Sequence, residues 1–161
     1  MAKLVALVSS LCILAIATLA SAHGHRTFNV EGDVYCDPCR VQFETELSQR
    51  LVGATVHLEC RHRDTKEVTY SVDGVTGVNG HYSLQVIGDH GEDECEISAV
   101  KSPRPDCSEP MGFIEKSRVV LTANDGMHAA VRFANPLGFQ TKTALPACGP
   151  VLFSLGVLVG Q

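Results

Sequence analysis

The stretch that decides the fold is Glu31-Gly32-Asp33-Val34-Tyr35-Cys36-Asp37-Pro38-Cys39-Arg40. Two cysteines stand three positions apart at the end of an alternating apolar run that starts at Phe28. Alternation of apolar and polar residues is typical of a strand with one buried face. The sequence therefore places a first strand here and ends it at a pair of cysteines.

Residues 1–22 have the composition of a secretory signal peptide. Lys3 supplies a positive charge, Leu4 to Leu19 is apolar, and Ala20-Ser21-Ala22 fits a cleavage site. The alternative is a transmembrane anchor, but the apolar run is short for a span and its small-residue end favours cleavage. We therefore expect a secreted protein of the extracellular space or apoplast. Residues 23–161 would form one domain with no membrane span after cleavage.

Cleavage leaves an even number of cysteines. Of seven in the chain, Cys12 lies in the leader, and the other six are Cys36, Cys39, Cys60, Cys95, Cys107 and Cys148. An even number in a secreted chain predicts a disulfide framework, although spacing alone does not choose the pairs. The mature chain would carry a formal net charge of −6, one below the −5 of the full chain, because the leader holds one Lys and no acidic residue. That charge argues against nucleic acid or an anionic membrane as partner.

Short alternating runs separated by turn residues predict an all-β domain. After the first strand, the runs are Gly53 to Leu58, Val68 to Val72, His81 to Ile87, Cys95 to Val100, Arg118 to Leu121 and Met127 to Phe133. About seven short strands indicate a single-domain antiparallel β-sandwich or barrel, here stapled by disulfides. Asp73-Gly74 is expected to form a turn, Arg40 to Leu51 a loop or one short helix, and Lys101 to Gly112 a proline-stiffened loop.

The pair Cys36 and Cys39 has two other interpretations. A thioredoxin-like redox pair needs alternating strands and long helices, which the pattern lacks. A zinc half-site needs a second pair with the same spacing, and the sequence has none. Structural disulfides therefore explain these cysteines best.

Several further short segments, spread over almost the whole mature chain, combine with the decapeptide into a pattern in a fixed order. Besides the decapeptide they are Phe43-Glu44-Thr45, Gly53 to Cys60, Gly80-His81-Tyr82, Gly88-Asp89-His90, Asp93 to Glu96 and Ala134 to Phe139. Together they resemble the pollen allergen Ole e I-like family of pollen and extensin-like proteins. The resemblance implies the pairs Cys36–Cys107, Cys39–Cys148 and Cys60–Cys95. Many family members carry an N-glycosylation sequon, but this chain has none.

Signatures of catalysis are weak in this sequence. No G-x-S-x-G elbow occurs. The acidic cluster of Asp89, Glu92, Asp93, Glu94 and Glu96 has the chemistry of a glycosidase pair or a calcium site, but a charged surface loop explains it as well. Cleavage would expose His23-Gly24-His25, whose amine and imidazoles suit Cu(II) or Ni(II), although a terminus with incidental histidines is the simpler explanation. We predict no catalytic residues, no metal site and no cofactor.

The resemblance implies a secreted, non-enzymatic plant protein that acts in pollen hydration, germination or pollen-tube growth. Its partner would be a protein, with a cell-surface receptor as one option, and some family members are allergens. We expect recognition at two polar loops, Arg61 to Glu67 and Gly88 to Glu94. The alternatives are an apoplastic enzyme or metal-binding protein, and a cell-wall structural component, which the absence of Pro-rich repeats disfavours.

Overall fold

The computed structural model describes residues 26–112 and 114–157. The predicted signal peptide, residues 1–22, and the histidines of His23-Gly24-His25 lie outside the described residues. Within the described part, no helix is both long and apolar enough to cross a membrane.

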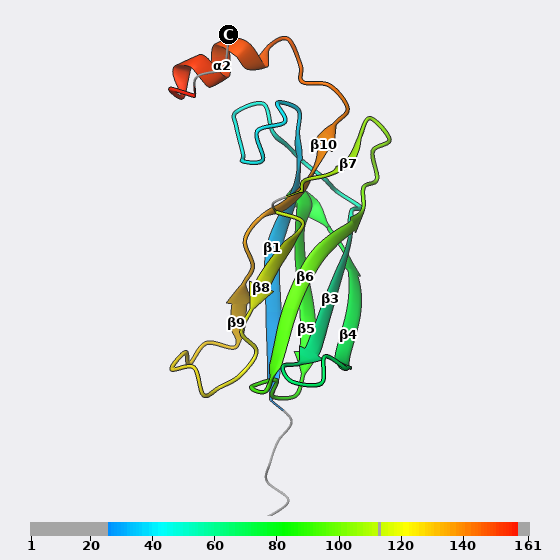
Figure 1. The fold of residues 1–161 in the computed structure, drawn as a ribbon, viewed down its shortest axis with the longest axis vertical. Coiled ribbons are helices and arrows are strands. Elements are labelled where there is room, and N and C mark those ends of the chain that lie inside the picture. Colours follow the sequence, from blue (N-terminus) through cyan, green and yellow to red (C-terminus); the bar gives the residue numbers. More distant parts are fainter. Residues whose placement is uncertain (1–25, 113, 158–161) are drawn as a thin grey trace, which may run out of the picture.

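Two sheets form an all-β sandwich, with one short helix at its end (Figure 1). The strands are β1 (Thr27–Asp37), β2 (Gln49–Arg50), β3 (Thr55–His62), β4 (Val68–Val75), β5 (His81–Ile87), β6 (Asp93–Lys101), β7 (Cys107–Pro110), β8 (Lys116–Val119), β9 (Val131–Phe133) and β10 (Leu137–Thr141). A 3-10 turn, η1 (Val78–Gly80), precedes β5, and the helix is α2 (Cys148–Ser154).

Strand β1 is the centre of the larger sheet. Its first half pairs with β5 antiparallel and with β9 parallel, and its second half pairs with β2 antiparallel and with β10 parallel. Strand β7 extends this sheet beyond β10. The smaller sheet has the order β4-β3-β6-β8 and is antiparallel throughout. The predicted all-β sandwich is confirmed, but it is not a closed barrel, and the two parallel ladders make one sheet mixed.

The core lies between the two sheets and is built by the alternation seen in the sequence. Along β1, Phe28, Val30 and Val34 are buried, while Asn29, Glu31 and Asp33 are half-buried. The facing sheet contributes Val56 and Leu58 from β3 and Ile97 from β6. Beside β1 in the larger sheet, β5 contributes Tyr82, Leu84 and Val86. Burial of each such side chain is worth about 1.5–3 kcal/mol relative to exposure.

Two glycines make close approaches that a larger residue would block. Gly32 lies in the decapeptide, and a Cβ there would stand 2.3 Å from Oη of Tyr82 on β5. Gly74 was expected in a turn but lies inside β4, where a Cβ would stand 2.2 Å from Cδ2 of Leu84. The turn prediction was wrong because the glycine serves close packing of the two sheets rather than a change of chain direction.

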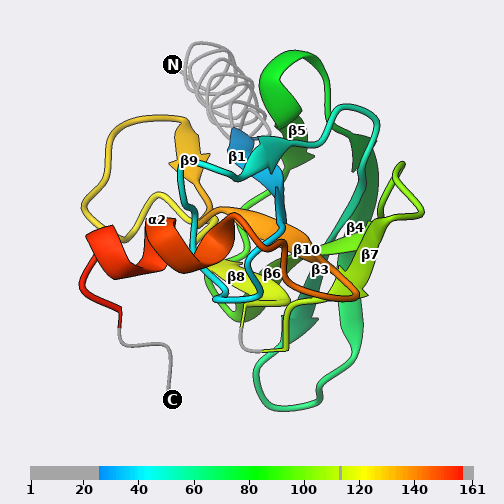
Figure 2. The same cartoon turned by 90° about the horizontal axis from the view of Figure 1, so that it is seen from above.

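The remaining strands sit in segments that were predicted as loops. Arg40 to Leu51 is a loop that contains only the two-residue strand β2, and Lys101 to Gly112 contains β7. Strand β10 and helix α2 were not predicted. Viewed from above, α2 lies across the end of the sandwich (Figure 2).

Candidate functional site

The two ends of the sandwich carry different chemistry. One, here the signature end, consists of residues 38–48 after β1 together with residues 142–157, which include α2. The other, the loop end, consists of the connections 63–67, 88–92 and 120–130. The two ends lie at opposite poles of the long axis (Figure 1).

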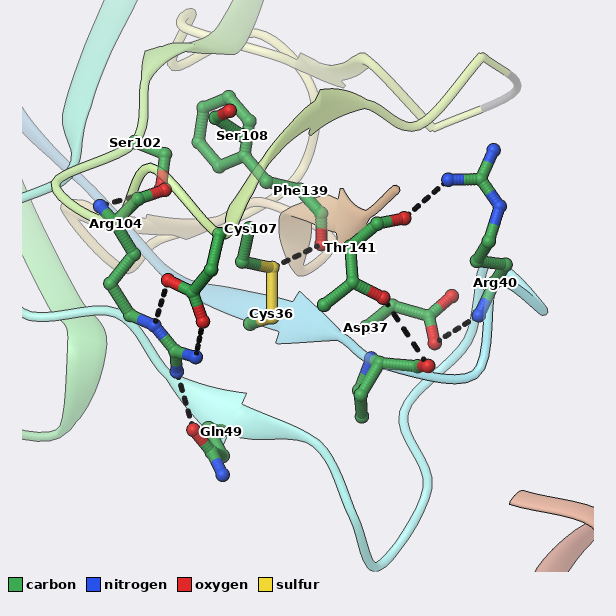
Figure 3. The surroundings of a disulfide bond; sticks show 12 residues. Cys36, Asp37, Arg40, Gln49, Ser102, Arg104, Cys107, Ser108, Phe139 and Thr141 are labelled. Carbon is green, nitrogen blue, oxygen red and sulfur yellow. Dashed lines mark hydrogen bonds and ion pairs between the residues drawn. A yellow bond between two sulfur atoms is a disulfide. The ribbon is translucent and has the colours of Figure 1, made fainter. Parts of the chain in front are cut away.

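A buried carboxylate holds the loop of the signature end (Figure 3). Oδ1 of Asp37 accepts hydrogen bonds from the backbone N–H groups of Cys39 (2.8 Å) and Arg40 (2.9 Å). Oδ2 accepts from those of Val41 (2.8 Å) and Gln42 (2.7 Å). Arg40 and Gln42 adopt positive φ angles of 60° and 61°, which non-glycine residues rarely do. Four charge-assisted hydrogen bonds stabilise this unusual turn.

Arg40 then joins the loop to the neighbouring strands. Its guanidinium forms an ion pair of 2.7 Å with Glu109 on β7 and donates to the backbone carbonyl of Thr141 on β10. Thr141 in turn donates its hydroxyl to the carbonyl of Pro38 (3.4 Å). The residues of the decapeptide thus connect three strands at this end.

The structure contains three disulfides, and they join the pairs that the family resemblance implies. Cys36–Cys107 links β1 to β7, Cys39–Cys148 links the loop to α2, and Cys60–Cys95 links facing positions of β3 and β6. Cys36 and Cys39 are therefore not joined to each other. The redox-pair and zinc interpretations of these two residues both require free thiols, which this pairing does not leave.

An apolar surface surrounds α2. Cys39, Cys148 and Leu152 form a small buried cluster of their own, separate from the main core. Beside it lies a cavity of about 340 Å³, whose lining includes Val41 and Leu145. The neighbouring large side chains are exposed, with 82% of Phe153 and 54% of Leu155 accessible. We call these residues the α2 surface: Val41, Leu145, Leu152, Phe153 and Leu155.

At the loop end, the acidic residues are mostly engaged within the protein. Asp89 accepts hydrogen bonds from the backbone N–H groups of Gly91 (3.1 Å) and Ala123 (3.3 Å). A hydrogen bond from Thr122 and these two backbone bonds outweigh partial desolvation and lower the pKa of Asp89. Glu94 lies 3.3 Å from Nζ of Lys66. The carboxylates of this charged loop therefore already have partners within the protein.

His90 and Asp93 form a buried pair within the same end. Nδ1 of His90 lies 2.9 Å from Oδ2 of Asp93, whose carboxylate also accepts from the Thr69 hydroxyl at 2.7 Å. Burial raises the pKa of Asp93, but the bonds from Thr69 and His90 and the nearby His90 and His62 rings outweigh it, so the pKa is lowered. A ring nitrogen of His90 and the sulfurs of Cys60 and Cys95 all lie within 4.8 Å of one another. Because those sulfurs are bonded together, this group is not a metal site as it stands.

Two histidines on strands, His57 and His81, have local carboxylate partners. His57 lies 2.6 Å from Asp73, and His81 lies 3.0 Å from Asp33. Both are partly exposed on outer faces of the sheets. Neither is brought together with a nucleophile.

Three features of the ends escaped the sequence analysis: the carboxylate of Asp37, the placement of His90 and the apolar α2 surface. The first had a usable signal, since Asp and Asn side chains commonly bond backbone N–H groups two or more residues ahead. The third had one as well, because Thr143 to Gln161 contains no charged residue. The position of His90 beside a disulfide depends on the folded topology.

The family model, the sequence relatives and a solved structure all point to the same group of proteins. The family model described as "Pollen protein Ole e 1 like" matches residues 26–156. The chain is 52% identical over 157 residues to the anther-specific protein LAT52 of Solanum lycopersicum, covering 98% of this chain and 97% of that protein. It is 48% identical to the Olee1-like protein of Betula pendula, with 92% and 90% of the two chains covered. The crystal structure of the major plantain pollen allergen Pla l 1 superposes with a TM-score of 0.69 at 44% identity, covering 76% of this chain and 99% of that one.

Proposed function

The chain belongs to the Ole e 1-like family of pollen proteins, and from that premise we propose that it acts outside the cell as a non-enzymatic interaction protein that binds its partner through the α2 surface. Two observations support an extracellular site of action. The leader ends in Ala20-Ser21-Ala22, and three disulfides suit an oxidising compartment. The relatives named above carry the names of pollen and anther proteins, and none of those names denotes an enzyme.

We choose the α2 surface as the binding site because the aromatic side chain of Phe153 is exposed there. That side chain is 82% accessible, and Phe153 directly follows Leu152, which lines the apolar cavity, in a segment from Thr143 to Gln161 that has no charged side chain. The centres of protein interfaces are depleted in charge and enriched in aromatic side chains, which often dominate the binding energy. The disulfide Cys39–Cys148 holds this surface to the sandwich, so little order has to be gained on binding.

The partner that fits this surface is a protein with a complementary apolar pocket, such as the outer domain of a cell-surface receptor. The loop end is the weaker choice because its carboxylates Asp89 and Asp93 hold their own loops. Surface charge there would act mainly on the rate of association.

Saturable binding of labelled mature protein to the surface of living pollen tubes tests the proposal. Phe153→Ala removes the exposed ring, and Phe133→Ala on β9 is the matched control because that ring is also 77% exposed. A ring that acts as a hot spot contributes at least about 2 kcal/mol, so Phe153→Ala should weaken binding roughly 30-fold while Phe133→Ala has little effect.

Equal loss in both variants, or none in either, would reject the α2 surface. Concentration-dependent dimers that disappear with Phe153→Ala would identify a second copy of the chain as the occupant instead. Hydrolysis of cell-wall material that disappears with Asp93→Asn would favour the enzyme alternative.

A further inference from the structure

The disulfide Cys60–Cys95 differs from the other two in having a histidine beside it. A ring nitrogen of His90 lies within 4.8 Å of both sulfurs, and among the described residues this is the one cluster of its kind that includes cysteines. The two cysteines face each other across β3 and β6, and their residues are 0% and 2% exposed. The histidine therefore shares a buried environment with the sulfur atoms.

The imidazole is held in a defined orientation. Thr69 donates to Asp93, and Asp93 contacts Nδ1 of His90, so the ring is oriented by a chain of hydrogen bonds. Its side chain is 9% exposed, and Nε2 has no hydrogen-bond partner among the described residues. The ring of Tyr70 packs against it at 5.2 Å between centroids. A carboxylate that orients a histidine with one free nitrogen is the arrangement that acid–base catalysis uses.

A cavity of about 290 Å³ gives small molecules a route to this group. Its lining includes Cys95, His90 and Asp93, together with two arginines, Arg63 and Arg118. Arg63 is exposed, and the carboxylates closest to Arg118 lie at 3.7 and 3.9 Å. The lining also includes Glu94, so two guanidinium groups and two carboxylates border the cavity and give it a polar, mixed-charge wall.

We propose that Cys60–Cys95 is a thiol–disulfide exchange site for a small thiol, with His90 as its acid–base group and Asp93 as the residue that positions the imidazole. The other two disulfides serve only the fold. This inference rests on the loop end and is independent of the α2 surface.

The exchange balances with two molecules of the thiol. The first, as a thiolate, attacks Sγ of Cys95; a mixed disulfide forms as the Cys60–Cys95 bond breaks. The electron pair leaves on Sγ of Cys60, which takes a proton from the protonated imidazole of His90. A second thiolate attacks the mixed disulfide, departs as the oxidised small-molecule disulfide and leaves Cys95 to be protonated. Two electrons and two protons pass from the thiols to the protein.

The protein supplies its own control. Cys39–Cys148 is as well buried, at 4% and 3% exposure, and it too borders a cavity. The cavity beside it is lined mainly by apolar side chains and has no histidine in its lining. Any difference in opening rate between these two bonds therefore reports the chemistry around Cys60–Cys95 rather than burial alone.

Reduced glutathione is the probe for the experiment. Mature protein is incubated with it, and opening of each bond is followed by two-step isotopic alkylation and peptide mass spectrometry. We expect Cys60–Cys95 to open at least about 10-fold faster than Cys39–Cys148, since acid–base assistance typically contributes 100-fold or more. The ratio of the two rates cancels the thiolate content of glutathione. It should therefore fall with rising pH, because the proposed step needs a protonated imidazole.

Other charged groups around His90 contribute to that pH profile. They are Asp93, His62, Glu94, Arg63 and Arg118, and Tyr70 contributes a neutral ring. His90→Asn keeps a donor for Asp93 and should bring the ratio close to one and make it flat with pH. Asp93→Asn should lower the ratio by a smaller factor while leaving some pH dependence, because it affects only the orientation of the ring.

Circular dichroism and the mass of the intact protein establish that each variant is folded with three cross-links. Equal opening rates in the wild type, or an unchanged ratio in folded His90→Asn, would overturn the proposal. If His90→Asn does not fold, the wild-type pH profile and the Asp93→Asn ratio decide the matter, and a flat wild-type profile refutes it.

Discussion

Asp37 at the signature end and Asp89 at the loop end perform the same task in opposite surroundings. Each carboxylate accepts hydrogen bonds from backbone N–H groups of a loop, four for Asp37 and two for Asp89. Asp37 is 0% exposed, whereas Asp89 is exposed. Because Asp37 itself is shut off from water, water cannot easily take over its four hydrogen bonds, whereas at the loop end water can replace the carboxylate of Asp89.

The disulfides extend the same contrast. Cys39–Cys148 and Cys36–Cys107 fix the signature end across sequence separations of 109 and 71, while Cys60–Cys95 spans 35. In the chain-entropy model, a longer closed loop restricts the unfolded chain more. The signature end is therefore held by disulfides to distant parts of the chain, whereas the loop end is held mainly by the hydrogen bonds between β3 and β6.

The largest expected effect comes from removing disulfides one at a time. The double variant Cys39→Ala/Cys148→Ala should lose about 5 kcal/mol of unfolding free energy, and Cys60→Ala/Cys95→Ala about 4 kcal/mol, from sequence separations of 109 and 35. Urea titration of both variants measures the two losses. Non-reducing peptide mapping of the wild type must first find the three pairs, and a Cys36–Cys39 link or a free thiol would contradict the pairing.

A smaller effect distinguishes the two carboxylates. Asp37→Ala removes the carboxylate that accepts from four N–H groups, one in a buried bond and three in partly buried ones. It should cost roughly 3 kcal/mol, since a buried group without an acceptor costs about 1–3 kcal/mol and the partly buried groups can regain water. Asp89→Ala should cost about 0.5 kcal/mol or less, as expected for an exposed site. Thermal or urea unfolding of both variants provides the comparison. Similar losses in the two would show that burial does not set the difference.

The smallest effect is the acid response of the loop end. The pKa values of Asp89 and Asp93 are lowered from 3.8 in the folded protein, so their contribution to stability is complete above about pH 4 and is lost as the pH falls through the lower folded values. Asp89→Asn/Asp93→Asn should therefore flatten the decrease in unfolding free energy between about pH 4 and 2. Asp64→Asn is the control, because this residue is exposed in the connection between β3 and β4. A decrease as steep as in the wild type would contradict this assignment.

The sequence predicted the long alternating strands and missed the short strands β2, β7 and β10. Alternation located β1, β3 and β5 because polar and apolar residues change places along each of them. Strand β10 (Leu137–Thr141) is buried at four consecutive positions, so it carries no alternation. Helix α2 begins Cys148-Gly149-Pro150 without a side-chain cap, and nothing in such a start predicts a helix.

The candidate sites divide in the same way. The cysteine pair next to Asp37 could be located by local spacing, and the family resemblance supplied its partners. His90 meets Cys60 and Cys95 only because β3 and β6 align those two residues and the preceding loop folds back over them. This contact depends on the register of β3 against β6, so it cannot be predicted from the composition or spacing of the residues.

The parallel ladder between β1 and β10 has a consequence for the order of synthesis. Val34 aligns with Leu137, about a hundred residues later, and Cys39 likewise has its partner at Cys148. During synthesis from the N-terminus, the chain thus presents β1 with Cys36 and Cys39 long before their partners exist. Cys60 and Cys95 can meet much earlier, since their loop is short and their ladder antiparallel. The first strand to emerge is completed by the last one, and until then Cys36 and Cys39 must be kept from oxidising with each other.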